Sequence, residues 1–292
     1  MKKVAIFGAS GYLGKNLVRA MTQRGVPVVA FVRDKESFEQ QFDSVETRKV
    51  CFDSCKPSNI ELTDCYAVIS ALGITKQRDG LSYEDVDYKV NALILHEAEK
   101  FGVQKFMYVS VFKGETFKDV SLCKAKEHFV TELTRSTIPS LVIRPTGFYS
   151  DMLDFLKMAQ NGKVHLFGGG KQKLNPISGN DLSIEMLRLL KNDSLFELKQ
   201  SINIGGPRTL SHFEIANLAF LALDKPTVVK IHPDWLRKMI LLLGRVFIPQ
   251  NIFGPYEFFF TAMGEDMNTN EYGIESLYTF FRNHAQTLSK QN

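Results

Sequence analysis

The sequence has few of the features that mark secreted, metal-binding or membrane-spanning chains. Its 292 residues include only four cysteines, Cys51, Cys55, Cys65 and Cys123, and these lack the C-x-x-C spacing of zinc sites and disulfide frameworks. The six histidines are scattered, so we expect no metal site. We predict reduced thiols in a cytoplasmic protein.

Long hydrophobic runs and a strong excess of one charge are also absent. The apolar run at residues 4–7 ends at Gly8, too early for a signal peptide, and the later run at 239–248 is interrupted by Arg245 and too short to cross a bilayer. Lys and Arg total 36 against 32 Asp and Glu. That small surplus gives no reason to expect nucleic acid as a partner.

The first half alternates short β-branched runs with longer amphipathic ones. Strands are predicted at residues 4–7, 28–32, 47–52, 66–70, 105–110 and 140–143, with helical patterns between most of them. Repeated β-α-β units require right-handed crossovers and a parallel sheet covered on both faces. We therefore predict an α/β fold with a doubly wound parallel sheet.

After Pro145 the pattern becomes less regular. Helices are predicted at residues 151–160 and 180–191, short strands at 201–204 and 227–231, and a helix whose N-terminus carries a capping box of Ser211 and Glu214. We expect a nucleotide-binding domain at residues 1–150 and a smaller, mixed α/β substrate-binding region at 151–292 packed against it.

The most informative segment is a glycine-rich loop between the first predicted strand and the first helix. It runs Gly8-Ala9-Ser10-Gly11-Tyr12-Leu13-Gly14. In such a loop one glycine permits a tight turn, another lets backbone N–H groups approach a pyrophosphate, and a third allows close packing of helix and strand. The positive end of the helix dipole then faces the phosphates.

The G-x-x-G-x-x-G spacing resembles that of atypical short-chain dehydrogenases/reductases. More narrowly, the chain is similar to the NmrA-like and divinyl-reductase-like branch, through about residue 206, and the resemblance implies a Rossmann fold and a nicotinamide cofactor. The implied cofactor contacts are Gly8, Ser10, Gly11, Tyr12, Leu13, Gly14, Arg33, Asp53, Ala71, Leu72, Gly73, Asn91 and Lys126.

The residue after the second strand bears on the choice of cofactor. About 20 residues beyond the glycine loop, an acid would bind the ribose 2′-hydroxyl of NAD. Here the strand is followed by Arg33, whose guanidinium can bind a 2′-phosphate, with Lys35 nearby. This favours NADP(H). If Asp34 instead points at the ribose, the preference reverses.

The catalytic residues that the resemblance implies are incomplete. Ser110 matches the family serine, and counting back from Arg144-Pro145 places the family lysine at Lys126, or in another register at Lys124. The tyrosine position then falls on Leu122 or Val120. Lys126 is otherwise a solvated helix lysine. Tyr149 is a candidate substitute proton donor, although aromatic residues after a strand usually pack in the core.

Two functions from different classes fit these residues. One is an NADPH-dependent reductase of a small or hydrophobic organic substrate, with a nonstandard group or water as the proton source. The other is a non-catalytic NAD(P)-binding sensor, regulatory or assembly protein, which the missing tyrosine favours. The sequence leaves the oligomeric state open.

A helix of strong apolar periodicity is predicted after Pro233. Its apolar residues recur at helical spacing, with Arg237, Lys238 and Arg245 on the other face. One interpretation is a helix that covers the core of the C-terminal region. The other is a movable lid or a membrane-surface element, because cationic and aromatic residues together suit an anionic interface.

Overall fold

The computed structural model describes residues 2–51, 60–74 and 80–289. The chain divides into two compact units. Unit 1 comprises residues 1–144 and 183–202, and unit 2 comprises residues 145–182 and 203–292. A segment beyond residue 150 thus returns to unit 1. The roles expected of the two regions, cofactor binding and substrate binding, stay a prediction.

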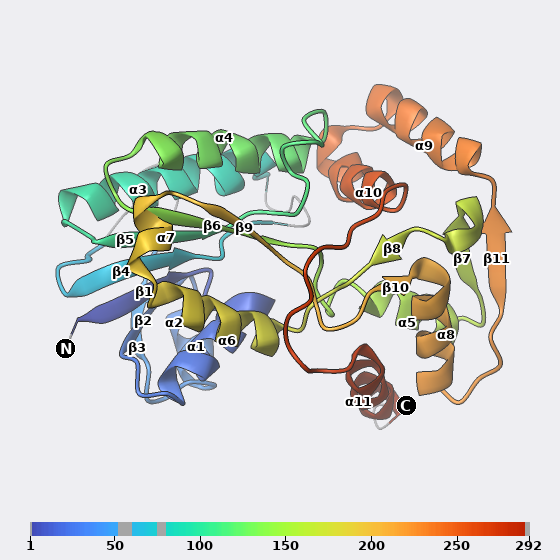
Figure 1. Ribbon diagram of the computed structural model, residues 1–292, viewed down its shortest axis with the longest axis horizontal. Coiled ribbons are helices and arrows are strands. Elements are labelled where there is room, and N and C mark those ends of the chain that lie inside the picture. Colours follow the sequence, from blue (N-terminus) through green and yellow to red (C-terminus); the bar gives the residue numbers. More distant parts are fainter. Residues whose placement is uncertain (1, 52–59, 75–79, 290–292) are drawn as a thin grey trace. The chain divides into compact units, whose positions relative to one another are not determined.

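A seven-stranded sheet forms the centre of unit 1 (Figure 1). Its strands are β1 (Lys3–Phe7), β2 (Val28–Val32), β3 (Glu46–Lys49), β4 (Cys65–Ser70), β5 (Lys105–Val109), β6 (Ser140–Pro145) and β9 (Ser201–Ile204). They lie in the order β3-β2-β1-β4-β5-β6-β9, and the first six pair in parallel. This order confirms the predicted doubly wound fold, with its crossover point between β1 and β4.

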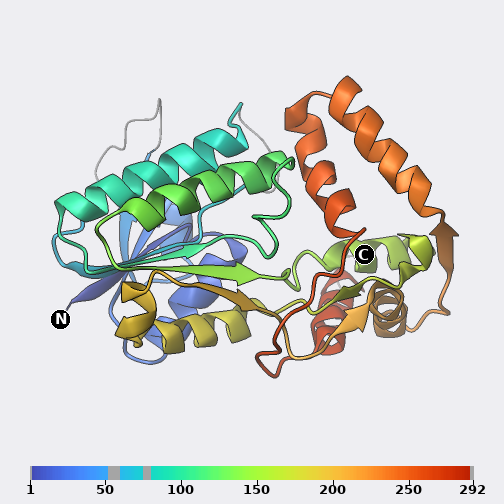
Figure 2. The same ribbon diagram turned by 45° about the horizontal axis from the view of Figure 1, so that its top comes forward.

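Helices cover both faces of this sheet. They are α1 (Tyr12–Thr22), α2 (Lys35–Glu39), the π-helical turn η2 (Glu84–Val90), α3 (Asn91–Lys100), α4 (Ser121–Arg135) and α7 (Asp193–Glu197), while α6 (Gly179–Leu190) crosses the division between the units. Helices α3 and α4 lie side by side on one face and α1 lies on the other (Figures 1 and 2).

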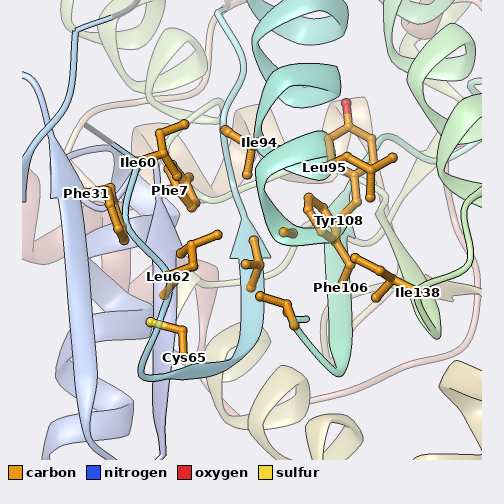
Figure 3. Close-up of a cluster of buried hydrophobic side chains, with 14 of the residues drawn as sticks. Phe7, Phe31, Ile60, Leu62, Cys65, Ile94, Leu95, Phe106, Tyr108 and Ile138 are labelled. Carbon is orange, nitrogen blue, oxygen red and sulfur yellow. The ribbon is translucent and has the colours of Figure 1, made fainter. Parts of the chain in front are cut away.

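The hydrophobic core beneath α3 and α4 is built from alternate residues of the strands (Figure 3). The rings of Phe7 and Phe31, on neighbouring strands, stack 4.3 Å apart. Phe129 of α4 contacts Tyr108 of β5 edge-on, with ring centroids 4.6 Å apart. Because both rings of each pair are buried, these contacts fix the positions of the strand ends that follow.

Unit 2 contains two small two-stranded sheets and several helices. Strand β7 (Val164–Phe167) pairs in parallel with β11 (Val229–His232), and β8 (Lys173–Leu174) pairs with β10 (Leu210–Ser211). The other elements are α5 (Leu153–Gln160), the short 3₁₀ turn η3 (Gly168–Gly170), α8 (His212–Ala222), α9 (Asp234–Phe247), α10 (Gln250–Ala262) and α11 (Leu277–Ser289). The capping box predicted for Ser211 and Glu214 is confirmed at the start of α8.

The predicted amphipathic helix is α9, but its apolar face is not buried. Its buried residues are Arg237 and Gly244, and its exposed ones include Trp235, Met239, Leu242, Leu243, Val246 and Phe247. The interpretation that this face covers the core is therefore wrong. No helix in the described part of the chain is long and apolar enough to span a membrane.

Candidate nucleotide-binding site

The glycine loop leaves β1 and leads into α1. Gly8 has a φ of +77°, and a Cβ at this position would lie 2.8 Å from the carbonyl oxygen of Ala71. A Cβ on Gly14 would lie 2.0 Å from the carbonyl oxygen of Gly8. Both glycines are therefore required by the close approach of loop, helix and neighbouring strand. Gly11 differs, because its Cβ would meet only the Gly8 carbonyl oxygen, at 3.3 Å.

The open side of this loop suits a pyrophosphate. Ser10 and Gly11 are exposed, and the first turn of α1, which begins with Tyr12 and Leu13, contains no acidic residue. A helix N-terminus presents N–H groups and a partial positive charge to an anion. The residues of this loop thus fit the phosphates of a dinucleotide.

At the end of β2, Arg33 is exposed, whereas the next residue, Asp34, is used to cap α2. The Asp34 carboxylate accepts a hydrogen bond of 3.0 Å from the backbone N–H of Ser37 and caps α2. Lys35 lies 3.6 Å from the carboxylate of Glu39. Arg33 is exposed and makes no ion pair or hydrogen bond within the described residues. Asp53 lies outside them.

The turn after β4 brings the predicted residues Ala71, Leu72 and Gly73 to the same edge of the sheet as the glycine loop. A Cβ on Gly73 would lie 2.6 Å from Oδ1 of Asp87 and 2.9 Å from Nζ of Lys126. A side chain at this exposed position would therefore collide with Asp87 and Lys126, so the glycine lets the backbone pass directly beside the amine of Lys126.

Lys126 forms a buried ion pair with Asp87. Its Nζ lies 2.9 Å from Oδ1 of Asp87, and the two side chains are 11% and 0% exposed. The other carboxylate oxygen accepts a hydrogen bond of 3.2 Å from the backbone N–H of Ile74. Burial alone would lower the pKa of Lys126, but Asp87 and Tyr108 together outweigh that effect and raise the pKa above its ordinary value.

Asn91 holds the backbone that carries Asp87. Its side-chain amide donates to the carbonyl oxygens of Val86 and Asp87, at 3.2 and 3.1 Å, and its oxygen accepts 2.5 Å from the Ser70 hydroxyl. These bonds link the end of β4 to the π-helical turn η2. Such turns are rare and often occur at functional sites. Asn91 is thus placed to position the Asp87 carboxylate.

Ser110 is hydrogen-bonded to a second ion pair, formed by Glu127 and Arg144 next to the first. Its hydroxyl donates to Oε1 of Glu127 at 2.9 Å. Both nitrogens of the Arg144 fork donate to the Glu127 carboxylate, at 2.6 and 2.7 Å. The Nζ of Lys126 lies 3.4 Å from the carbonyl oxygen of Val109, the residue before Ser110. Ser110 and Lys126 are therefore brought together, although the serine hydroxyl is directed at Glu127.

The positions expected for the missing tyrosine, Val120 and Leu122, are filled by buried apolar side chains. Among the described residues of unit 1, Tyr108 lies near Lys126, whose Nζ is 5.4 Å from its ring centroid. Burial raises the pKa of Tyr108 well above its ordinary value. Tyr149 belongs to unit 2, where its hydroxyl donates to the carbonyl oxygen of Glu275 at 2.5 Å.

Sequence reasoning missed Asp87 and Glu127, and it gave Arg144 no role beyond a family signature. A signal for Asp87 exists, because an acid four residues before Asn91 lies on the same helical face as the predicted site. Glu127 follows Lys126 directly, but nothing local indicates that Arg144 is its partner. No three potential metal ligands gather among the residues that the structure describes.

Comparison with known families shows where the chain belongs. A model of the family described as NAD(P)H-binding matches residues 8–192. The chain belongs to the NAD(P)H-binding family. The predicted kinship with atypical NAD(P)-binding reductases is confirmed by this match and by the relatives below.

Two curated relatives come from Arabidopsis thaliana. The divinyl chlorophyllide a 8-vinyl-reductase is 25% identical over 78% of this chain, and subunit 9 of the NADH dehydrogenase 1 alpha subcomplex is 23% identical over 77%. The matches cover 59% of each relative. The chain thus spans about three fifths of their length.

A solved structure with the same fold is that of the NADPH-dependent quinone oxidoreductase QOR2 from Escherichia coli in complex with NADPH. It superposes with a TM-score of 0.72 at 14% identity, covering 98% of this chain and 99% of that one.

Proposed function

We propose that the protein is an NADPH-dependent reductase of a small or hydrophobic organic substrate. The observation that carries the proposal is one sheet edge that combines the open side of Gly11 with the charged Lys126 beside Gly73. In this proposal unit 1 binds the cofactor and unit 2 contributes the substrate-binding residues. The expected cytoplasmic location stays a prediction.

The preference for NADPH rests on the end of β2. The Asp34 carboxylate, which could accept a ribose 2′-hydroxyl, instead accepts the backbone N–H of Ser37 as the cap of α2. Arg33 is exposed and can bind a 2′-phosphate with two parallel hydrogen bonds.

NADPH, when bound, would supply a hydride. The task of Lys126 is to hold a positive charge and orient hydroxyl groups near Gly73, because its raised pKa makes it a poor proton donor at neutral pH. The proton then comes from Ser110, Tyr149 or water. Ser110 would have to turn away from Glu127, and Tyr149 from the Glu275 carbonyl.

A second function is favoured by a specific observation. The apolar side chains of Val120 and Leu122 fill the tyrosine positions, and one relative is a subunit of a mitochondrial NADH dehydrogenase. A non-catalytic NAD(P)-binding assembly or regulatory protein would need the glycine loop and Arg33 without a proton donor.

Calorimetric titration tests the cofactor site. Gly11→Val should abolish NADPH binding, because the added side chain would stand where the pyrophosphate approaches the loop. It should leave folding intact, because the added Cβ meets only the Gly8 carbonyl oxygen, at 3.3 Å. Gly14→Val should instead unfold the protein, since its Cβ would overlap that oxygen. Arg33→Ala should weaken NADPH binding by about 1.5 to 3 kcal/mol and NADH binding little. Arg24→Ala, at an exposed position before β2, is the control, and equal losses for both cofactors would exclude Arg33.

Nicotinamide absorbance tests turnover with a panel of quinones, enones and aldehydes. A reductase should oxidise NADPH faster than the uncatalysed rate with a member of this panel. Lys126→Met should slow that reaction, whereas Lys124→Met, at an exposed position on the same helix, should not. Tight NADPH binding without turnover on any substrate would favour the assembly or regulatory function.

A further inference from the structure

Helices α9 and α10 form a hairpin (Figures 1 and 2). The charged residues Arg237 and Glu257 of this hairpin are buried, whereas many of its large apolar side chains are exposed. Seventeen large apolar side chains are exposed among the described residues, and nine of them lie between residues 235 and 256. They are Trp235, Met239, Leu242, Leu243, Val246, Phe247, Ile248, Ile252 and Tyr256. A monomeric protein in water rarely exposes so many apolar side chains together.

The inner side of the hairpin explains this orientation. Gly244 has no side chain where α10 approaches, since a Cβ there would lie 2.1 Å from the ring of Phe253. Arg237 is buried and donates to the Phe260 carbonyl oxygen at 2.8 Å and to the Asp234 carboxylate at 2.7 Å. The helix therefore cannot rotate its apolar stripe inward without exposing these contacts and burying other charges.

The outer side has one continuous stripe with a cationic edge. At about 100° per residue, Trp235, Met239, Leu242 and Val246 share one side of α9, and Leu243 and Phe247 widen that stripe. Lys238 and Arg245 are seven residues apart, so they lie together beside the stripe. The Nζ of Lys238 lies 3.3 Å from the Asp234 carboxylate, at the first residue of the helix.

Charges on the hairpin indicate which partner covers the stripe. Between Trp235 and Tyr256 the charged residues are Arg237, Lys238 and Arg245. The next acid, Glu257, is buried and bound to Arg245 at 2.8 Å. Asp234, at the start of α9, is already paired with Arg237 and Lys238. A second copy of this face would therefore bring the same cations and no unpaired carboxylate from α9, whereas an anionic lipid surface supplies negative charge and an apolar interior.

We infer that the α9–α10 hairpin is a membrane-surface element that lies in the plane of an anionic bilayer. The apolar stripe enters the region between headgroups and acyl chains, with Trp235, Phe247 and Tyr256 at the interface, where aromatic side chains are favoured. Lys238 and Arg245 contact the anionic headgroups. Binding is predicted to weaken with salt, because surface charges are screened. This inference does not depend on the reductase proposal.

The single tryptophan provides a direct test in the full-length protein. Trp235 is 63% exposed, so its emission should shift to the blue on vesicles of phosphatidylcholine with phosphatidylglycerol. Cosedimentation with the same vesicles should give a partition coefficient. Vesicles of phosphatidylcholine alone should bind far less protein. Absence of both the emission shift and cosedimentation at low ionic strength would overturn the inference.

Matched variants separate the hairpin from the rest of the surface. Lys238→Glu should lower the partition coefficient about 25-fold, because it changes the charge by two units and each unit near an anionic surface contributes about fivefold. Lys157→Glu is its control, since Lys157 is 69% exposed and Lys238 71%, and each lies 3.2 to 3.3 Å from an aspartate. Leu242→Ser should lower partitioning about tenfold. Its control is Leu198→Ser, with exposures of 66% and 68%.

Thermal unfolding should show that all four variants fold like the wild type. Equal losses of partitioning in the variants and their controls would overturn the inference. Sedimentation velocity adds a further outcome. A dimer that Leu242→Ser dissociates would show that a second copy of the chain, rather than a lipid surface, covers the stripe, and would also overturn it.

Discussion

Helices α4 and α9 both have amphipathic sequences, but α4 buries its apolar face and α9 exposes it. Helix α4 buries Leu122, Cys123, Ala125, Phe129 and Leu133, whereas α9 buries Arg237 and Gly244 and exposes its apolar stripe. An amphipathic pattern therefore defines two faces of a helix without stating which face meets protein. The neighbouring element decides that.

The neighbours of the two helices differ in chemistry. Helix α4 packs on a sheet whose strands present aromatic rings, and Phe129 contacts both Phe106 and Tyr108. Helix α9 meets α10, which offers the Glu257 carboxylate, the Phe260 carbonyl oxygen and the ring that fits over Gly244. The apolar face of α4 therefore packs on apolar rings, whereas the charged side chains of α9 pair with charged and polar groups of α10.

Truncation of one phenylalanine on each helix should give the largest contrast. Phe129→Ala should lower the free energy of unfolding by about 3 to 5 kcal/mol, because it leaves a cavity in a fully buried site. Phe247→Ala, at a position 75% exposed, should change it by less than about 0.5 kcal/mol. Denaturant unfolding followed by circular dichroism measures both.

The two variants also control each other for the type of substitution. Similar losses of stability would mean that Phe247 is buried in solution, which would remove the difference between the helices. A Phe129→Ala loss confined to one phase of a two-phase transition would assign that phase to unit 1.

The local parts of the fold could be predicted from the sequence. The glycine loop, the strand ends at Arg33 and Gly73, and the capping box of Ser211 depend on residues close together in the chain, so spacing alone indicates them. The outward face of α9 could not be predicted in this way, because it depends on what α10 presents to it.

The candidate site shows the same limit. Lys126 could be placed by its distance from Arg144 in the sequence, but its partner Asp87 is 39 residues earlier and on a different helix. The bidentate contact of Glu127 with Arg144 likewise joins a helix to a strand. Such pairs arise only when the sheet brings distant elements together, so local periodicity does not reveal them.

Removal of one carboxylate from the contacts of each helix, Glu127 of α4 and Glu257 of α10 next to α9, should sharpen the comparison. Glu127→Ala should cost about 3 kcal/mol of unfolding free energy, because it leaves the Arg144 side chain, 4% exposed, without its main partner. Glu257→Ala should cost about 1 kcal/mol, because Arg245 is 38% exposed and water can solvate it.

Equal costs for the two substitutions would contradict this difference in solvation. Glu127→Gln and Glu257→Gln test whether charge is responsible, since the amide keeps the shape of the side chain. We expect most of the Glu127→Ala loss to persist in Glu127→Gln.

Helix α8 adds a third arrangement, an inward ionisable group that is kept neutral. His212 is the first residue of α8, and burial lowers its pKa to about 4, although Asp266 opposes that shift. The unfolded chain has an imidazole pKa of about 6.5. The unfolded state therefore binds more protons between these values, and stability is lost as the pH falls below about 6.5.

A dependence of stability on pH follows from this difference. Between pH 7 and pH 5 the wild type should lose about 2 kcal/mol of unfolding free energy through His212. His212→Gln should remove that part of the pH dependence, and His96→Gln, at an exposed position on α3, should leave it unchanged. Denaturant unfolding at the two pH values measures the slope. The same slope in wild type and His212→Gln would show that His212 gains a proton without loss of packing. In that case His212 would stay buried in its charged form without an ion-pair partner among the described residues, unlike Glu127 of α4, which is paired with Arg144, and Arg237 of α9, which is paired with Asp234.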